Sequence, residues 1–244
     1  MLDIALALIG VGATVTGVED LVAHRRLASL LGYGRHRGAI IGALGALLAL
    51  LGVAAFVLQT WSPTNSSAHA GAVITGLLVA FLVRSFVMQS NDGADRMFIV
   101  VLVLTGVGYA STTGPAWLPL AWSWTVIAIV GIAYFESGLA KVRVKGWREG
   151  RTLALVMNVP DLGNENAARF LLDSPRVSFI ASWGVIGLEL SAGPMFALSN
   201  ATALLAVMLL GLMHAGIAIL MGLGRFFWSF GAALVLVLVA RALL

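Results

Sequence analysis

Residues 134–141 read Tyr134-Phe135-Glu136-Ser137-Gly138-Leu139-Ala140-Lys141. They place an acid and an amine inside an apolar run over 120–144, which is long enough to cross a bilayer as a helix. A charge in hydrocarbon costs roughly 3 kcal/mol or more, so an ionisable residue there indicates a function. Lys141 lies near the end of the run and also has a simpler interpretation, in which its amine reaches the headgroups. Glu136 lies more than one turn deeper and is harder to accommodate in lipid.

Apolar composition extends over the whole chain. Of the 244 residues, 60% are hydrophobic and 11% are charged, whereas soluble domains carry about 25% charged residues. The fold is therefore predicted to be all-α: a polytopic transmembrane helical bundle of about eight spans that forms a single integral-membrane domain over 1–244. Glu19 and Asp20 shorten the apolar part of the first span. The spans are expected at 3–23, 38–60, 71–89, 96–114, 120–144, 177–198, 201–223 and 226–243.

Basic residues alternate between the loops. The first, third, fifth and seventh loops contain arginine or lysine, whereas 61–70, 115–119 and 199–200 contain neither. By the positive-inside rule, this pattern predicts that the odd-numbered loops face the cytoplasm and that both termini lie outside. We expect an integral protein of a bacterial inner (plasma) membrane, with the lipid bilayer as its partner. Because the arginines crowd into short loops, the net charge of +4 does not indicate binding to nucleic acid.

The longest connection, about 145–176, is expected on the cytoplasmic side. A loop longer than about 12–15 residues usually has a function or contains its own short helix. Apolar and charged residues alternate from Glu165 to Leu172, which favours an interfacial helix there.

Polar residues also lie inside other predicted spans. Counting about 1.5 Å per residue places Arg84, Glu136 and His214 at similar depths, with Glu189 in the outer half. Lys141 lies about 140° around the helix from Glu136 and is not its local partner, so Glu136 is expected to pair with Arg84 or His214. Each residue also has a structural interpretation: Arg84 extends to the headgroups, His214 bonds between helices, and Glu189 is protonated.

The same residues suit acid–base chemistry. Burial in apolar surroundings disfavours the charged form of a lysine, and an amine that is partly neutral can act as a general base near pH 7. No metal site is expected, because the four histidines lack the spacing of metal ligands.

Three motifs resemble a known family. The pattern Tyr134-Phe135-x-x-Gly138-x-x-Lys141, followed by Trp147-x-Glu149-Gly150, resembles the segment with the catalytic lysine in vitamin K-dependent γ-glutamyl carboxylases and in the wider horizontally transferred transmembrane (HTTM) family. His214, followed by Gly224 and Phe226, is similar to the family's histidine-led helix that ends in Gly-x-Phe. The run Asn91-Asp92-Gly93-Ala94-Asp95 is similar to a turn of bacterial members. The resemblance covers about 80–230.

The resemblance implies a carboxylase-like membrane enzyme that modifies a peptide. Lys141 would be the base that deprotonates vitamin K hydroquinone or another quinol, with carbon dioxide and oxygen as co-substrates. Ser137 and Gly138 would leave room for a flat ring, and His214 would position the quinol. The catalytic residues would then be Lys141, His214 and Glu136. The cofactor-binding residues would be Tyr134, Ser137, Gly138, Trp147, Arg84, Asn91, Asp95 and Glu189.

Other classes of function remain open. The chain is alternatively a non-catalytic membrane partner in the maturation or export of a secreted peptide, as suggested by family members with such a role, or a protein that only binds a quinone. A third possibility is a proton-coupled transporter that uses Glu136, Glu189 and Arg84. No inverted repeat is evident in the sequence to support transport.

Overall fold

The computed structural model describes residues 2–30, 35–61, 67–88, 92–159 and 163–244. Within these ranges it contains eleven helices and no strands, and eight of the helices are long and apolar enough to cross a membrane. The prediction of an all-α polytopic bundle is confirmed, and the chain is an integral membrane protein. The eight long helices are α1 (Leu2–Leu30), α2 (Arg35–Trp61), α3 (Ser67–Met88), α4 (Gly93–Ser111), α5 (Leu118–Arg143), α9 (Pro175–Leu198), α10 (Asn200–Met221) and α11 (Gly224–Ala242).

Local capping explains where two of these helices differ from the expected spans. α4 begins at Gly93, three residues early, because the Asp92 side chain accepts a 2.9 Å hydrogen bond from the backbone N–H of Asp95. α10 ends at Met221 because Gly222 has a φ of 66°, a left-handed conformation that glycine adopts without strain.

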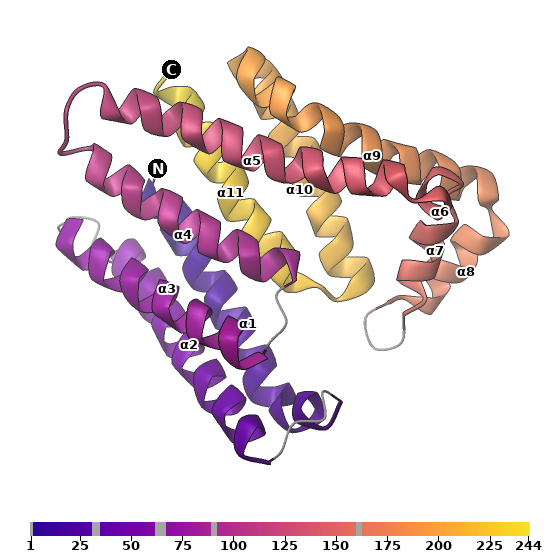
Figure 1. Ribbon diagram of the computed structural model, residues 1–244, viewed down its shortest axis with the longest axis horizontal. Helices are drawn as coiled ribbons and strands as arrows, with labels where there is room; N and C mark the ends of the chain where they lie inside the picture. The colour runs from indigo at the N-terminus through magenta and orange to yellow at the C-terminus, as the bar shows by residue number, and fades with distance from the viewer. Residues whose placement is uncertain (1, 31–34, 62–66, 89–91, 160–162) are drawn as a thin grey trace. The chain divides into compact units, whose positions relative to one another are not determined.

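The contacts divide the chain into two compact units, and α11 contributes residues to both. Unit 1 comprises Met1–Trp122 and Trp228–Leu236. In unit 1, α1 packs along α2, and α3 packs against both α2 and α4 (Figure 1). Glycines permit the close approach of α1 and α2: a Cβ atom at Gly45 would lie 2.6 Å from the carbonyl oxygen of Gly17. The Phe81 and Phe98 rings stack between α3 and α4, with centroids 4.8 Å apart.

Unit 2 comprises Ser123–Phe227 and Val237–Leu244. Its α5 and α9 touch at a glycine pair, where a Cβ atom at Gly131 would lie 2.9 Å from the Cα atom of Gly193. α9 then turns into α10 through a capping box, in which Ser199 and Thr202 each accept a hydrogen bond from the other's backbone N–H. This packing gives the polar side chains of α5, α9 and α10 a fixed register.

The long connection after α5 folds into three short helices: α6 (Lys145–Arg148), α7 (Arg151–Met157) and α8 (Glu165–Asp173). The predicted helix from Glu165 to Leu172 is confirmed as α8, whose N-cap is Asn164. α8 packs on α7 through a small apolar cluster of Ala154, Met157, Ala168 and Leu171. In Figure 1 these helices lie beside the ends of α5 and α9.

Three side chains of α9 hold this connection in place. Ser178 Oγ donates to the carbonyl oxygen of Gly150 at 2.6 Å, and Ser182 Oγ donates to that of Trp147 at 2.6 Å. Trp183 Nε1 donates to the carbonyl oxygen of Arg148 at 3.1 Å. These bonds orient the turn that carries Trp147.

Candidate functional site

A lysine and a glutamate pair inside unit 2. The Lys141 amine of α5 donates to Glu189 Oε1 at 2.8 Å and to Oε2 at 2.7 Å. Ser137, one turn before Lys141, accepts a bond from the amine at 2.7 Å and donates one to Glu189 Oε1 at 3.1 Å. The Glu189 side chain is 6% exposed and that of Lys141 is 19% exposed. The pair is therefore largely shielded.

A second polar contact lies on the same face of α5. The Tyr134 hydroxyl and Nε2 of His214 on α10 are 2.9 Å apart, and both residues are buried. The Tyr134 ring also packs edge-on against Phe196, with centroids 6.2 Å apart. Because residues 134, 137 and 141 follow helical spacing, they form one polar stripe that faces α9 and α10. We call the stripe with its partners, Tyr134, Ser137, Lys141, Glu189 and His214, the lysine cluster.

An aromatic ring lies beside the amine. The Lys141 Nζ atom lies 5.4 Å from the centroid of the Trp147 ring, within the range of a cation–π contact. Trp147 belongs to α6, whose backbone is held by Ser182. The family-like motif at 134–150 thus brings two of its residues, Lys141 and Trp147, into contact.

An apolar groove of about 430 Å³ runs along α5 and α9. Its walls include Gly131 and Phe135 of α5 and Gly193 and Pro194 of α9. Gly193 lies about one turn from Glu189 on the same helix. The residues of the lysine cluster are not among those that line the groove.

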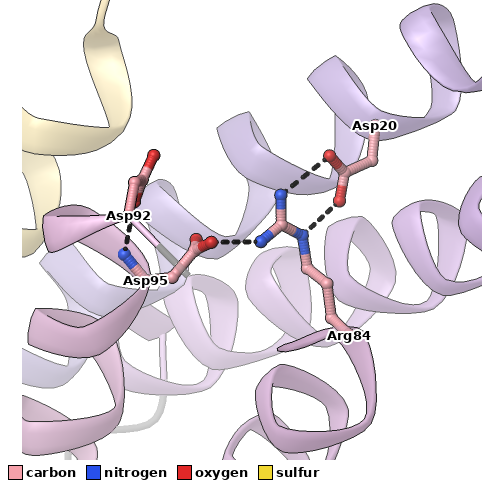
Figure 2. Close-up of polar contacts among 4 residues, drawn as sticks. All are labelled: Asp20, Arg84, Asp92 and Asp95. Atoms are coloured by element: carbon pink, nitrogen blue, oxygen red, sulfur yellow. Dashed lines mark hydrogen bonds and ion pairs between the residues drawn. The ribbon is translucent and has the colours of Figure 1, made fainter. Parts of the chain in front are cut away.

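Unit 1 holds a separate ion-pair network (Figure 2). The Arg84 guanidinium of α3 bonds both carboxylate oxygens of Asp20 on α1 through Nε and Nη2. Its Nη1 donates to Asp95 Oδ2 of α4 at 2.6 Å. All three side chains are at most 5% exposed. The network joins three helices, and Asp92 fixes Asp95 by capping its backbone N–H.

The expected pairing of Glu136 with His214 is wrong. Glu136 is exposed on α5, and within unit 2 no hydrogen bond or ion pair joins it to His214. Arg84 bonds Asp20 and Asp95 instead, and His214 bonds Tyr134. Counting the rise per residue placed these side chains at similar depths in the membrane. It contained no information on which helices are neighbours.

The expected depth of Glu189 is also wrong. Counting from the helix ends placed it in the outer half, away from Lys141, yet the two side chains are in contact. The first turns of α9 extend past the end of α5 and bond to the α6–α7 turn through Ser178 and Ser182. Glu189 therefore lies level with the last two turns of α5.

Two further cofactor-binding expectations have different outcomes. Gly138 was expected to leave room for a flat ring, but Leu190 fills that side: a Cβ atom at Gly138 would lie 3.0 Å from Leu190 Cγ. Asn91 lies outside the described residues.

Asp20, the bidentate partner of Arg84, was not identified from the sequence. An acid in one span and an arginine in another is a signal that could have paired them.

Within the described ranges, no group of three or more histidine, cysteine or acidic side chains has the arrangement of a metal site. Comparisons of the chain with protein-family models, with curated proteins and with solved structures find no match.

Proposed function

We propose that this protein is a membrane-embedded, carboxylase-like enzyme in which the lysine cluster binds a lipid-soluble quinol and Lys141 acts as the base. The observation that carries the proposal is the hydrogen-bonded pair of Lys141 and Glu189 in apolar surroundings. Such a pair is costly to bury and contributes little net stability. A function explains its presence better than a structural need does.

The pair also offers a route to a neutral amine. A proton can move from Lys141 Nζ to a Glu189 oxygen 2.7 Å away, so that an N–H bond breaks and an O–H bond forms. The neutral Lys141 amine can then accept a proton from a bound hydroxyl group, and Glu189 holds the proton that the amine released.

The donor set of the lysine cluster fits a quinol. When bound, a quinol supplies an acidic hydroxyl proton and reducing electrons. The Lys141 amine lies 5.4 Å from the centroid of the Trp147 ring, a surface on which a flat ring can stack, while Leu190 excludes a ring from the Gly138 side. The apolar groove along α5 and α9 suits a hydrocarbon tail. A peptide substrate and the use of carbon dioxide and oxygen follow only from the family resemblance.

We also propose a bacterial plasma membrane as the location, with the end of α5 at Lys141 on the cytoplasmic side and both termini outside. The alternation of basic loops supports this orientation.

Mass spectrometry of lipids extracted from gently solubilised protein tests the proposal. We expect a quinone to co-purify with the wild type and to be lost from Lys141→Ala and Trp147→Ala. Arg143→Ala removes an exposed cation from the same helical turn and should retain the quinone. Absence of quinone from the wild type, or equal loss in all three variants, would contradict the proposal.

Proton-coupled transport is a second candidate, favoured by the buried network of Asp20, Arg84 and Asp95 in unit 1. Ionisable groups between membrane helices are a recurring feature of proton relays. In proteoliposomes with an imposed pH gradient, the transport reading predicts proton flux that Arg84→Ala abolishes. No flux above that of empty liposomes excludes it.

A further inference from the structure

A hollow of about 390 Å³ lies at the N-terminal end of α9. Its lining residues are Glu149, Pro175, Arg176, Phe179 and Ile180. Arg176 is exposed, and Phe179 and Ile180 are 47% and 70% exposed. Because the candidate span begins at Pro175, the hollow lies where the helix meets the headgroup layer. It combines a guanidinium with apolar walls.

One acidic and one basic residue line the hollow. Its one acidic residue, Glu149, accepts hydrogen bonds from Arg151 and lies 3.6 Å from the Lys145 amine. These contacts, the Arg151 hydrogen bonds first, hold the pKa of the Glu149 carboxyl below its ordinary value. Because Glu149 is already engaged by Arg151 and Lys145, Arg176 is the charged lining residue left to attract an anion.

The neighbouring short helices expose apolar side chains as well. Leu155 of α7 and Phe170 and Leu172 of α8 are each about half exposed or more. The opposite face of α8 is polar and includes Arg169. A short helix with one polar face and exposed apolar flanks suits the headgroup layer of a bilayer.

We propose that this hollow binds the headgroup phosphate of an anionic phospholipid at Arg176, with the acyl chains against Phe179 and Ile180. A membrane lipid fits better than a free phosphate ion, because an ion would leave the two exposed apolar side chains uncovered. The bonds from Ser178 and Ser182 to the α6–α7 turn keep the hollow open without a ligand. The surface thus anchors residues 145–176 to one leaflet.

Native mass spectrometry of the full chain tests the proposal. The protein is equilibrated in nanodiscs of equal parts phosphatidylcholine and phosphatidylglycerol, and the lipids retained after transfer to detergent are counted. We expect the wild type to enrich phosphatidylglycerol. Arg176→Gln should reduce its retention about fivefold, the effect of one cation near a membrane surface. Arg176→Lys should keep most of it, and Phe179→Ala should reduce retention of both lipids.

Arg169→Gln is the matched control, because it removes an exposed cation from the same segment outside the hollow. It should retain lipid as the wild type does, and unchanged melting temperatures should show that both variants fold. Equal retention in Arg176→Gln and wild type would overturn the proposal. Equal loss in Arg169→Gln, or displacement of the lipid by inorganic phosphate, would overturn it as well.

Discussion

The Lys141 amine donates hydrogen bonds to both carboxylate oxygens of Glu189, at 2.8 and 2.7 Å. Each group is the other's principal charged partner in the lysine cluster, and Ser137 bonds to both. The relationship explains how a membrane helix tolerates Lys141. It also supplies the proton acceptor that a lysine base requires.

Replacing one member of this pair should destabilise the protein more than replacing both members. Glu189→Met leaves a shielded ammonium with no acidic partner in the lysine cluster, and we expect a loss of about 3 kcal/mol in the free energy of unfolding. The double variant Lys141→Met with Glu189→Met should recover most of that loss, because no unpaired charge remains. Unfolding in mixed micelles measures both values. A double variant as unstable as the single one would contradict this reading.

Substitution of Arg84 should destabilise the protein more than substitution of an exposed arginine does. Arg84→Ala leaves Asp20 and Asp95 buried without their shared cation, and we expect a loss of about 3–5 kcal/mol. Arg84→Lys should recover only part, since an ammonium cannot reproduce the three-way guanidinium geometry. Arg96→Ala, at an exposed position on α4, is the control and should change stability little. Similar melting temperatures for all three variants would count against a structural role for the network.

The glycine pair of α5 and α9 provides a packing test. A Cβ atom at Gly131 would lie 2.9 Å from the Gly193 Cα atom, so Gly131→Ala should push the helices apart and cost about 1–3 kcal/mol. A Cβ atom at Gly184 would have no neighbour within 4 Å. Gly184→Ala should therefore be neutral or stabilising by up to about 1 kcal/mol. Thermal unfolding of the two variants compares them directly. Equal effects would show that the close contact is absent.

How far the sequence predicts the structure depends on the kind of feature. The eight spans follow from apolar length alone, because a membrane-crossing helix must satisfy its backbone internally. The start of α4 at Gly93 needed the Asp92 cap, which acts on a single turn. The first span was expected over 3–23, with its apolar part shortened by Glu19 and Asp20. The helix continues to Leu30, and Asp20 is buried against Arg84.

The candidate site was only partly predictable for a related reason. Lys141, Glu189 and His214 were each identified because polar residues are rare in spans. Their pairing depends on helix rotation and on how far α9 extends beyond α5. Neither quantity can be read from one segment at a time. For this reason Glu136 was assigned a partner and Glu189 was placed too far from Lys141.

Outside the spans, Glu149 gives a prediction on pH. Arg151 lowers the pKa of the Glu149 carboxyl from its ordinary value of 4.5. A lowered pKa means that the contact stabilises the fold above about pH 4.5 and that this contribution disappears as the pH falls through the lowered pKa. NMR titration of the labelled carboxyl should give a midpoint below 4.5, and Arg151→Gln should raise it. A wild-type midpoint at 4.5 would contradict the contact.

We propose that the shielded Lys141 amine acts on a flat, lipid-soluble ring. The direct test is a crystal structure grown in a lipid mesophase with a saturating short-chain naphthoquinone. We expect ring density against Trp147, with an oxygen within hydrogen-bonding reach of Lys141 Nζ. A Lys141 amine that points into bulk water, with no ring density beside it, would disprove the proposal.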